Sequence, residues 1–353
     1  MANGDTSPSR VGQVNSAGDT DALFLKKFSG EILQTFEESN IFKALHTVRT
    51  IENGKSAQFP VTGIASAAYH TPGENIADAG NSYLSDIKKA EKVITIDKML
   101  LASTFLSNID DVKNHYDIRS VYANELGKAL AVRFDTALAK VFIAAARSAA
   151  AVTGGKTGGI LDVSANAMGD VSDSSDDADN TDPTGAELTA ALFTAAQKLD
   201  ENDVPSDGRF CVLRPQEYYK LITGGAGQLA ISTSAVNKDV GGVGSIASGS
   251  IPQIAGITIY KSNHIPSTDL SADATGDGDA ANDVFGAGGV GYNGNFTNTL
   301  GVVSHSAAVG TVKLLDLATE SEYQIERQGT LFVAKYAMGH GVLRPECAIE
   351  LQK

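Results

Sequence analysis

The sequence has little of what marks several large classes of protein. Tryptophan is absent from the 353 residues, and there are two cysteines, Cys211 and Cys347. Because these lie far apart and form no CxxC pair, they indicate neither a disulfide framework nor a zinc site. No apolar run approaches the ~20 residues of a membrane-spanning helix, and the polar N-terminus lacks the apolar segment of a signal peptide. We therefore expect neither a disulfide-rich secreted scaffold nor a membrane partner.

Positive charge is also scarce. The chain has 28 lysines and arginines against 42 aspartates and glutamates, a formal net charge of −14, and no basic patch is visible. Since neutralisation of phosphates supplies most of the affinity of proteins for nucleic acids, a dedicated nucleic-acid-binding function is disfavoured. The acidic surplus is typical of a surface that repels polyanions.

Complete catalytic motifs are missing as well. Two segments, Gly-Lys-Thr at 155–157 and Gly-Lys-Ser at 54–56, resemble the end of a phosphate-binding loop. The glycine that the motif requires five residues earlier is replaced by Ala150 and by Arg49. The six histidines form no HxxxH or HExxH pair. The two acidic loops, at residues 170–182 and 269–283, lack EF-hand spacing, so solvated loops are favoured over calcium sites. We expect no catalytic residue, no cofactor and no metal.

The most informative stretch present is residues 117–151. It has no proline, and apolar residues such as Leu130, Phe134 and Leu138 recur three and four positions apart, which predicts a helix of roughly 50 Å at ~1.5 Å per residue. A compact globule rarely needs one helix of this length, so we interpret it as the spine of a flat domain. Arg133 and Lys140 fall off the apolar stripe and are expected to face solvent or partners.

A second stretch, residues 56–105, predicts a long β-hairpin. Its flanks alternate apolar and polar residues, and its middle is polar and interrupted by Pro72 and Gly73. Each leg of ~15 residues would reach about 50 Å at ~3.3 Å per residue. Because a two-stranded ribbon is marginal alone in water, this one is expected to lie along another copy of the chain.

The remaining pattern predicts an N-terminal extended arm and an α/β unit. Thr184 and Glu187 have the spacing of a capping box that begins a helix. Further predicted elements are strands at 209–213, 257–260 and 300–304, and a helix at 215–222. Near the C-terminus a strand at 330–338 is expected to turn at residues 339–341 and to return as 347–351.

Several strings resemble the major capsid proteins of short-tailed, autographivirus-type bacteriophages. They are LFLKKFSGEIL (23–33), GKSAQFPV (54–61) with AAY and PGENI, AEKVITID (90–97), NHYDIRSVYANELGKALA (114–131), AVGTVKLLDLA (308–318) and AKYAMGHGVLRPE (334–346). The last string is long and unusual in composition, and the resemblance is weaker between residues 154 and 300.

This resemblance implies an α+β protein with the HK97-type capsid fold. The implied parts are an N-terminal arm (1–51), an extended β-hairpin loop (52–106), a peripheral domain with the spine helix (107–183 and 305–353) and an axial α/β domain (184–304). The implied function is self-assembly into hexamers and pentamers of an icosahedral head around double-stranded phage DNA. Implied partners are a scaffolding protein, a portal protein and DNA without sequence-specific contacts, and the implied location is the virion, after assembly in the host cytoplasm.

Alternatives remain at this point. An encapsulin-like shell for non-genomic cargo would share the fold, while an enzyme would need a complete motif and a secreted adhesin would need a signal peptide. Some proteins of this fold crosslink lysine to asparagine between subunits, but we expect no crosslink here. The residues expected to contact neighbouring subunits are Phe28, Phe59, Tyr69, Pro72, Glu74, Asn75, Lys88, Lys89, Lys92 and Arg344.

Overall fold

The structure is a computed structural model of the chain. It describes residues 40–77, 83–84, 87–96, 99–108, 118–163, 183–223, 251, 253–270 and 294–353. The predicted N-terminal arm up to residue 39, including Phe28, lies outside the described residues, as do most of the two acidic loops. The chain is mixed helix and sheet, as expected from the sequence.

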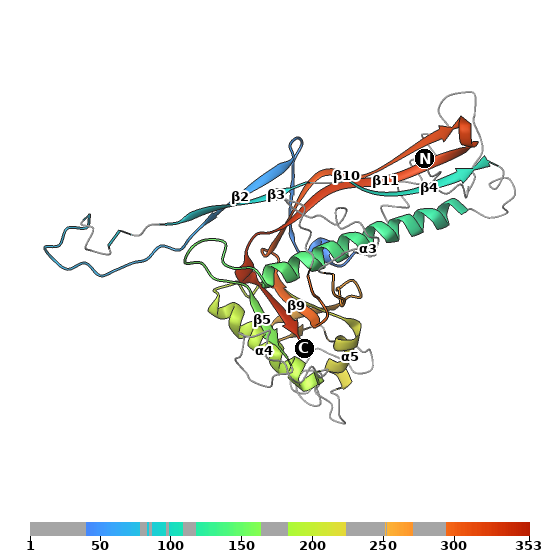
Figure 1. Ribbon diagram of the computed structural model, residues 1–353. Coiled ribbons are helices and arrows are strands. Elements are labelled where there is room, and N and C mark those ends of the chain that lie inside the picture. Colours follow the sequence, from blue (N-terminus) through green and yellow to red (C-terminus); the bar gives the residue numbers. More distant parts are fainter. Residues whose placement is uncertain are drawn as a thin grey trace.

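The elements form an extended body with one long projection (Figure 1). Helix α3 (Ile118–Ala146) runs beside a sheet of long strands. A ribbon of β2 (Ser56–Thr62) and β3 (Lys89–Thr95) projects to the left in Figure 1, beyond the end of the sheet that lies near the C-terminal end of α3. A second sheet, covered by α4 (Gly185–Glu201) and α5 (Pro215–Thr223), lies on the other side of the helix.

Helix α3 is the predicted spine, and it has 29 residues. In its C-terminal half every residue from Ala137 to Ile143 is buried, so this half has no solvent face. The expectation for Lys140 was therefore wrong, because its side chain is only 3% exposed. The physical reason is that the helix lies between two sheets, with β11 on one side and β12 on the other.

The first sheet has the strand order β1-β10-β11-β4. Its members are β1 (Thr47–Thr50), β10 (Val309–Gln324), β11 (Gly329–Val342) and β4 (Leu100–Ser107). Along β11 the burial alternates: Phe332 and Ala334 are buried against α3, whereas Leu331 and Val333 on the other face are partly exposed. One face of this sheet is therefore packed, whereas the other is open around residues 331–335 and covered by the ribbon root at residues 337–341.

Strand β11 corrects one prediction. It continues through residues 339–341, which were expected to form a turn, and pairs with β10 as far as Val342. Two glycines of β11 allow β3 to approach the sheet closely. A Cβ on Gly339 would collide with the carbonyl of Thr95 in β3, and one on Gly341 would collide with the side chain of Ile94. The glycines let the root of the ribbon cross the sheet.

The second sheet has the order β5-β12-β9-β6-β8-β7. Its strands are β5 (Gly159–Asp162), β12 (Ala348–Gln352), β9 (Thr299–His305), β6 (Arg209–Leu213), β8 (Ile257–Lys261) and β7 (Gln253–Ile254). The predicted strands at β6, β8 and β9 and the predicted helix at α5 are confirmed. The C-terminal strand exists as β12, but it pairs with β9 and β5 and is not the return of β11.

Helix α4 begins where the sequence places it. The Thr184 hydroxyl accepts a hydrogen bond from the Glu187 backbone N–H, and the Glu187 carboxylate accepts one from the Thr184 N–H, which completes the capping box. Leu188, Leu192 and Leu199 on one face of α4 are fully buried. This helix therefore covers the second sheet with the predicted apolar face.

The ribbon is shorter than predicted. Its two strands are seven residues each, paired antiparallel from Ser56↔Thr95 to Thr62↔Lys89. The residues expected to extend its second leg form β4 instead, which leaves the ribbon and pairs with β11. Apolar and polar residues alternate through both β3 and β4, so the pattern could not reveal that β3 pairs with β2 whereas β4 pairs with β11.

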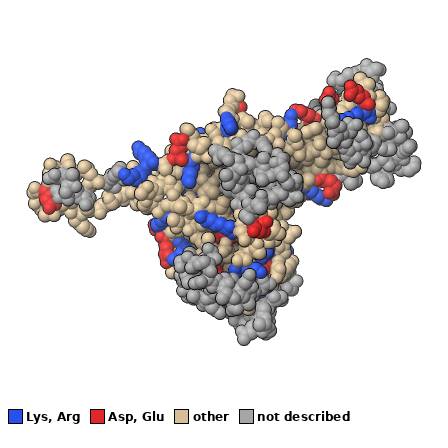
Figure 2. Space-filling model, in the orientation of Figure 1, with Lys and Arg blue, Asp and Glu red and all other residues tan. Residues whose placement is uncertain are grey.

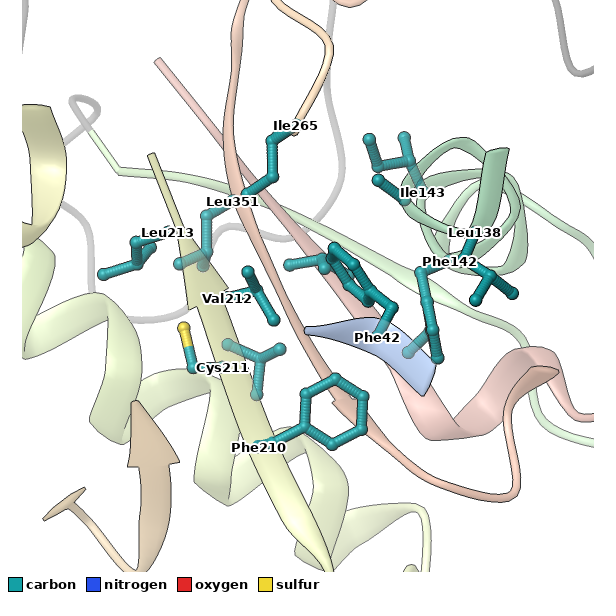
Figure 3. Close-up of a cluster of buried hydrophobic side chains, with 14 of the residues drawn as sticks. Phe42, Leu138, Phe142, Ile143, Phe210, Cys211, Val212, Leu213, Ile265 and Leu351 are labelled. Carbon is teal, nitrogen blue, oxygen red and sulfur yellow. The ribbon is translucent and has the colours of Figure 1, made fainter. Parts of the chain in front are cut away.

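The main core lies between α3, the short 3-10 helix η1 (Phe42–Ala44) and the second sheet. Figure 3 shows Phe42, Phe142 and Phe210 brought together from these three parts. Ring centroids are 5.7 Å apart for Phe42 and Phe142 and 5.5 Å apart for Phe142 and Phe210. Aromatic pairs at such distances add roughly 0.5–1.5 kcal/mol beyond burial, so this cluster fixes the helix on the sheet.

A partly buried ion pair fastens the end of α3 to the second sheet. The Arg147 guanidinium donates to both oxygens of Glu350 in β12, with Nε–Oε2 and NH2–Oε1 distances of 2.6 and 2.7 Å. It also donates to the carbonyl oxygen of Asn295 and stacks 5.2 Å from the ring centroid of Phe296. Glu350 is fully buried and also accepts from the Thr299 hydroxyl. A charge on the spine is thus neutralised by a residue about 200 positions away.

We predict strong coupling within this pair. Arg147→Met leaves the fully buried Glu350 charge without its partner, which should cost about 3–5 kcal/mol of unfolding free energy. Glu350→Leu leaves a partly exposed guanidinium that keeps the Asn295 carbonyl oxygen, so it should cost less. The double substitution should cost less than the sum, because neither charge remains. Urea unfolding of the unassembled subunit measures this, with Lys198→Ala, in a surface pair with Glu201, as a control that changes little. Additive losses would contradict the account.

Candidate subunit interface

The projecting loop between β2 and β3 has a locally organised tip. Tyr83 is its centre: its hydroxyl accepts a hydrogen bond from the Thr71 N–H at 2.9 Å and donates to the Glu74 carboxylate. The His70 ring lies against the Tyr83 ring, with centroids 5.1 Å apart, and its Nε2 is 2.9 Å from the carbonyl oxygen of Glu74. Residues 70–74 are therefore folded back onto one tyrosine.

The same projection carries large apolar side chains on its surface. Tyr69 is fully exposed at 102%. The other exposed apolar residues of the loop and ribbon are Ile64, Ile76, Leu84, Ile87 and Val93. Scattered exposed apolar residues are normal, but a series of this length on a thin projection without a core indicates an interaction surface.

The root of the ribbon, in contrast, is packed within its own chain. Ala57 and Ile94 are buried against Val312 and Ala337 of the first sheet. Phe59, one of the predicted contact residues, is partly buried here, and the Arg49 guanidinium lies 5.5 Å from its ring centroid. The structure thus gives Phe59 a role inside the subunit, where it supports the ribbon.

The predicted contact residues fall into separate groups. Tyr69, Pro72, Glu74 and Asn75 are all exposed and lie together at the tip. Lys88 and Lys89 are exposed, and Lys92 is partly exposed opposite Phe59 in the ribbon register. Figure 2 shows basic side chains along the ribbon between its tip and the body.

Arg344 does not belong to this surface. It is exposed and follows β11 in the body of the protein, where its N–H donates to the carbonyl oxygen of Ala308 at 3.2 Å. Sequence reasoning also missed Tyr83 and the exposed isoleucines and leucines. The presence of large apolar residues within an otherwise polar loop was the feature of the sequence that could have indicated them.

A second open surface is the face of the first sheet that points away from α3. We call it the outer face. Leu101 is 58% exposed there, and Phe105, Leu331 and Val333 are partly exposed. In the strand register Leu101 is opposite Lys335, and Phe105 is opposite Leu331. The surface is bordered by two exposed acidic residues of β10, Glu320 and Glu322, the former paired with Lys335 at 2.6 Å. It is apolar along its middle and acidic at one side.

The other motifs of the sequence have structural roles. Lys156, within the incomplete phosphate-loop motif, donates to the carbonyl oxygen of Glu201 at the end of α4 and pairs with Asp203. Burial raises the pKa of the Cys347 thiol to about 11, which keeps it protonated and unreactive. Among the described residues, no group of three or more histidines, cysteines or acidic residues could hold a metal ion. No helix in the described part of the chain is long and apolar enough to cross a membrane.

Comparison with known proteins agrees with this architecture. The family model described as Gp10A-like major capsid protein matches residues 58–352. The major capsid protein of Escherichia phage T7 is 35% identical over 345 residues, which cover 95% of this chain and 93% of that protein. The major capsid protein of Enterobacteria phage T3 is 35% identical over 346 residues, with 96% and 93% covered.

Solved structures show the same likeness. The capsid of Cyanophage P-SCSP1u matches with a TM-score of 0.70 and 40% identity, covering 98% of each chain. The mature capsid of bacteriophage PhiM1, at a TM-score of 0.64 and 17% identity, shares the fold. A spine helix between two sheets, with a ribbon projecting from the first, defines a shell protein of the HK97-type fold.

The chain belongs to the Gp10A-like major capsid protein family. It is a structural protein of a phage virion, and its location is the capsid. The alternative of a compartment for other cargo is not favoured, because the likeness at 35–40% identity is to phage capsid proteins. A virus-like particle from Pyrococcus furiosus, at 13% identity and a TM-score of 0.52, shares only the fold.

We predict that Tyr83→Phe weakens assembly without weakening the subunit. The substitution removes the hydroxyl that holds Thr71 and Glu74, so the tip loses its organisation, while the core is untouched. The critical concentration for assembly, measured by light scattering, should rise several-fold, and the urea midpoint should stay unchanged. Tyr260→Phe removes the same atom from an exposed side chain of β8, away from the tip and from the proposed contact residues, and should have little effect. Equal effects of the two substitutions would refute the role of the Tyr83 brace.

Proposed function

We propose that this chain assembles into hexamers and pentamers of an icosahedral head that encloses double-stranded phage DNA. The observation that carries the proposal is the projecting ribbon and tip, which expose apolar side chains and have no core of their own. A two-stranded ribbon of this kind is marginal alone, so it requires a surface on another copy. Membership of the major capsid family supports the same conclusion.

The outer face of the first sheet is the proposed receiving surface for a neighbour's ribbon. Its apolar middle matches the exposed Val93 and Ile87 of the ribbon. Its acidic border at Glu320 and Glu322 complements Lys88 and Lys89. Opposite charges at such a rim mainly fix the register and the partner, while burial of the apolar residues supplies most of the affinity.

The parts of the subunit then take distinct roles in the lattice. We assign residues 1–51 as the N-terminal arm, 52–106 as the extended loop, 107–183 with 305–353 as the peripheral domain, and 184–304 as the axial domain. The axial domain, with α4 and α5, would meet its copies at the centre of each capsomer. Tyr69, Pro72, Glu74, Asn75, Lys88, Lys89 and Lys92 would contact the neighbour through the loop.

Assembly is the proposed activity, rather than catalysis. We propose a scaffolding protein and a portal protein as assembly partners, and packaged DNA that is held without sequence-specific contacts. The net charge of −14 supports this role for DNA, because an acidic wall does not trap a polyanion. A shell subunit of this kind needs no cofactor.

Removal of the tip tests this proposal. We predict that replacing residues 65–86 by a short glycine-serine turn leaves the subunit folded, because β2, β3 and the ribbon root are retained. Circular dichroism and urea unfolding should match the wild type, whereas electron micrographs with the scaffolding protein should show no closed shells. Normal shells from this variant would refute the proposal.

The wild-type chain, expressed in parallel with the same scaffold, is the positive control. A conservative second variant, Ile76→Ser with Leu84→Ser, keeps the loop length and removes only exposed apolar surface. It should raise the critical concentration for assembly, whereas the control substitution Val132→Ser on the exposed side of α3 should not.

A further inference from the structure

Residues 40–50 are held to the body in an unusual way, and we call this segment the N-terminal strap. It contains η1 and β1, and β1 pairs in parallel with β10. Phe42 of the strap is fully buried, and the backbone N–H groups of Ile41 and Phe42 donate to the Asp135 carboxylate on α3 at 2.8 and 3.4 Å. The strap is therefore fastened to the spine helix at one end and to the first sheet at the other.

His46 lies between these two fastenings and is buried. Its Nδ1 is 2.8 Å from the carbonyl oxygen of Phe42. Because a carbonyl oxygen only accepts, Nδ1 must carry the proton, and Nε2 holds the lone pair. That Nε2 is buried and has no hydrogen-bond partner among the described residues. Protonation would therefore create a charged N–H where no acceptor faces it.

A second buried histidine faces the same place from the first sheet. His340 on β11 is 3% exposed, and its Nδ1 is 2.8 Å from the Thr311 hydroxyl on β10. The rings of His46 and His340 flank Phe134, with centroid distances of 6.1 and 5.2 Å. Burial lowers the pKa of both imidazoles, to about 3 for His340, whose pKa is lowered further by His46. Two neutral imidazoles and one phenyl ring thus fill the junction.

The charged groups around this junction come from three parts of the chain. On α3, Asp135 raises the pKa of His46, but the effect of burial is larger. On β11, Tyr336 packs edge-on against Phe134, and burial raises the pKa of its phenol while the nearby Arg133 of α3 acts in the opposite direction. From the loop after β8, the His264 Nδ1 lies 3.1 Å from Asp135 and shares that carboxylate with the strap. Asp135, the carboxylate beside the junction within the described part of the chain, is thus already engaged.

We propose that His46 and His340 form an acid-sensitive latch, which holds the N-terminal strap on the spine helix and the first sheet and opens in mild acid. The strap leads directly to residues 1–39, so the latch controls where the N-terminal arm is anchored. The latch lies within one subunit, so its test does not depend on the proposed contacts between subunits.

The direction of the pH effect follows from linkage. Both histidines bind a proton less readily in the folded chain than in the unfolded chain, whose histidine pKa is about 6.5. The stability of the closed latch is therefore complete above about pH 6.5 and is lost as the pH falls from there towards the folded pKa values. Each histidine should weaken the closed state by up to about tenfold per pH unit in this window.

Exchange of the histidine C2 hydrogen, read by mass spectrometry, tests the latch in unassembled subunits and in whole particles. His46 and His340 should titrate below the pKa of ~6.5 of an unperturbed histidine. Amide exchange in residues 41–50, corrected for intrinsic rates, should accelerate between about pH 7 and pH 5 while α3 remains protected. The proposal would be overturned if both histidines titrated with a pKa of about 6.5. It would also be overturned if amide exchange in the strap accelerated only when exchange in α3 accelerated as well.

Substitution gives an independent test. In His46→Gln with His340→Gln, the urea midpoint should no longer fall between about pH 7 and pH 5 as it does in the wild type. His305→Gln, at the partly exposed end of β9, is the matched control and should keep the wild-type slope. An unchanged slope in the double variant would also overturn the latch. If the double variant does not fold, the wild-type exchange measurement alone decides.

Discussion

The structure depends on holding a long helix rigidly between two sheets. The C-terminal half of α3 is buried on all sides, so its polar groups must be matched inside the protein. Asp135 accepts from two backbone N–H groups of the strap and lies beside His264, and Arg147 pairs with both oxygens of Glu350. A buried pair of this kind gives little net stability, but it penalises any other placement of the helix strongly. The helix direction is thereby fixed relative to both sheets.

This rigidity explains how a thin ribbon can serve as an interface element. The ribbon root is packed against the first sheet through Ile94 and Ala57, and glycines in β11 let it approach closely. Beyond the root the projecting loop has no core of its own. Its order depends on the hydrogen bonds of Tyr83 to Thr71 and Glu74 and on contacts with another copy. An assembly subunit needs a projection whose root is held rigidly and whose tip still exposes apolar surface. Only another copy of the chain can then bury that surface.

Much of this fold could be predicted from local patterns. The spacing of Leu130, Phe134 and Leu138 gave the spine, and Thr184 with Glu187 gave the start of α4. Strand β10 was missed because its distal half has one open face and is rich in acidic residues. Gly339 was interpreted as part of a turn because glycine most often marks one, whereas here it allows a close crossing.

The error about Lys140 has a physical cause, which is that its surroundings come from segments distant in the sequence. Lys140 and Arg147 fall off the apolar stripe, but the second sheet covers that side of the helix and Glu350 neutralises Arg147. Phe59 is partly buried and lies beneath Arg49 in the subunit, and its contact with a neighbour stays a prediction. The exposure of the tip residues could be predicted because polar loops with proline and glycine lie on surfaces, and their contacts with a neighbour stay predictions. The role of Glu74 with Tyr83 required the folded geometry.

The central claim is that the projection becomes ordered by burial against another copy. Amide hydrogen exchange of residues 64–77, compared between unassembled subunits and closed shells, tests this most directly. The account predicts fast exchange in the free subunit and strong protection in the shell, with α3 protected in both. Equal exchange of residues 64–77 in the two states would contradict it.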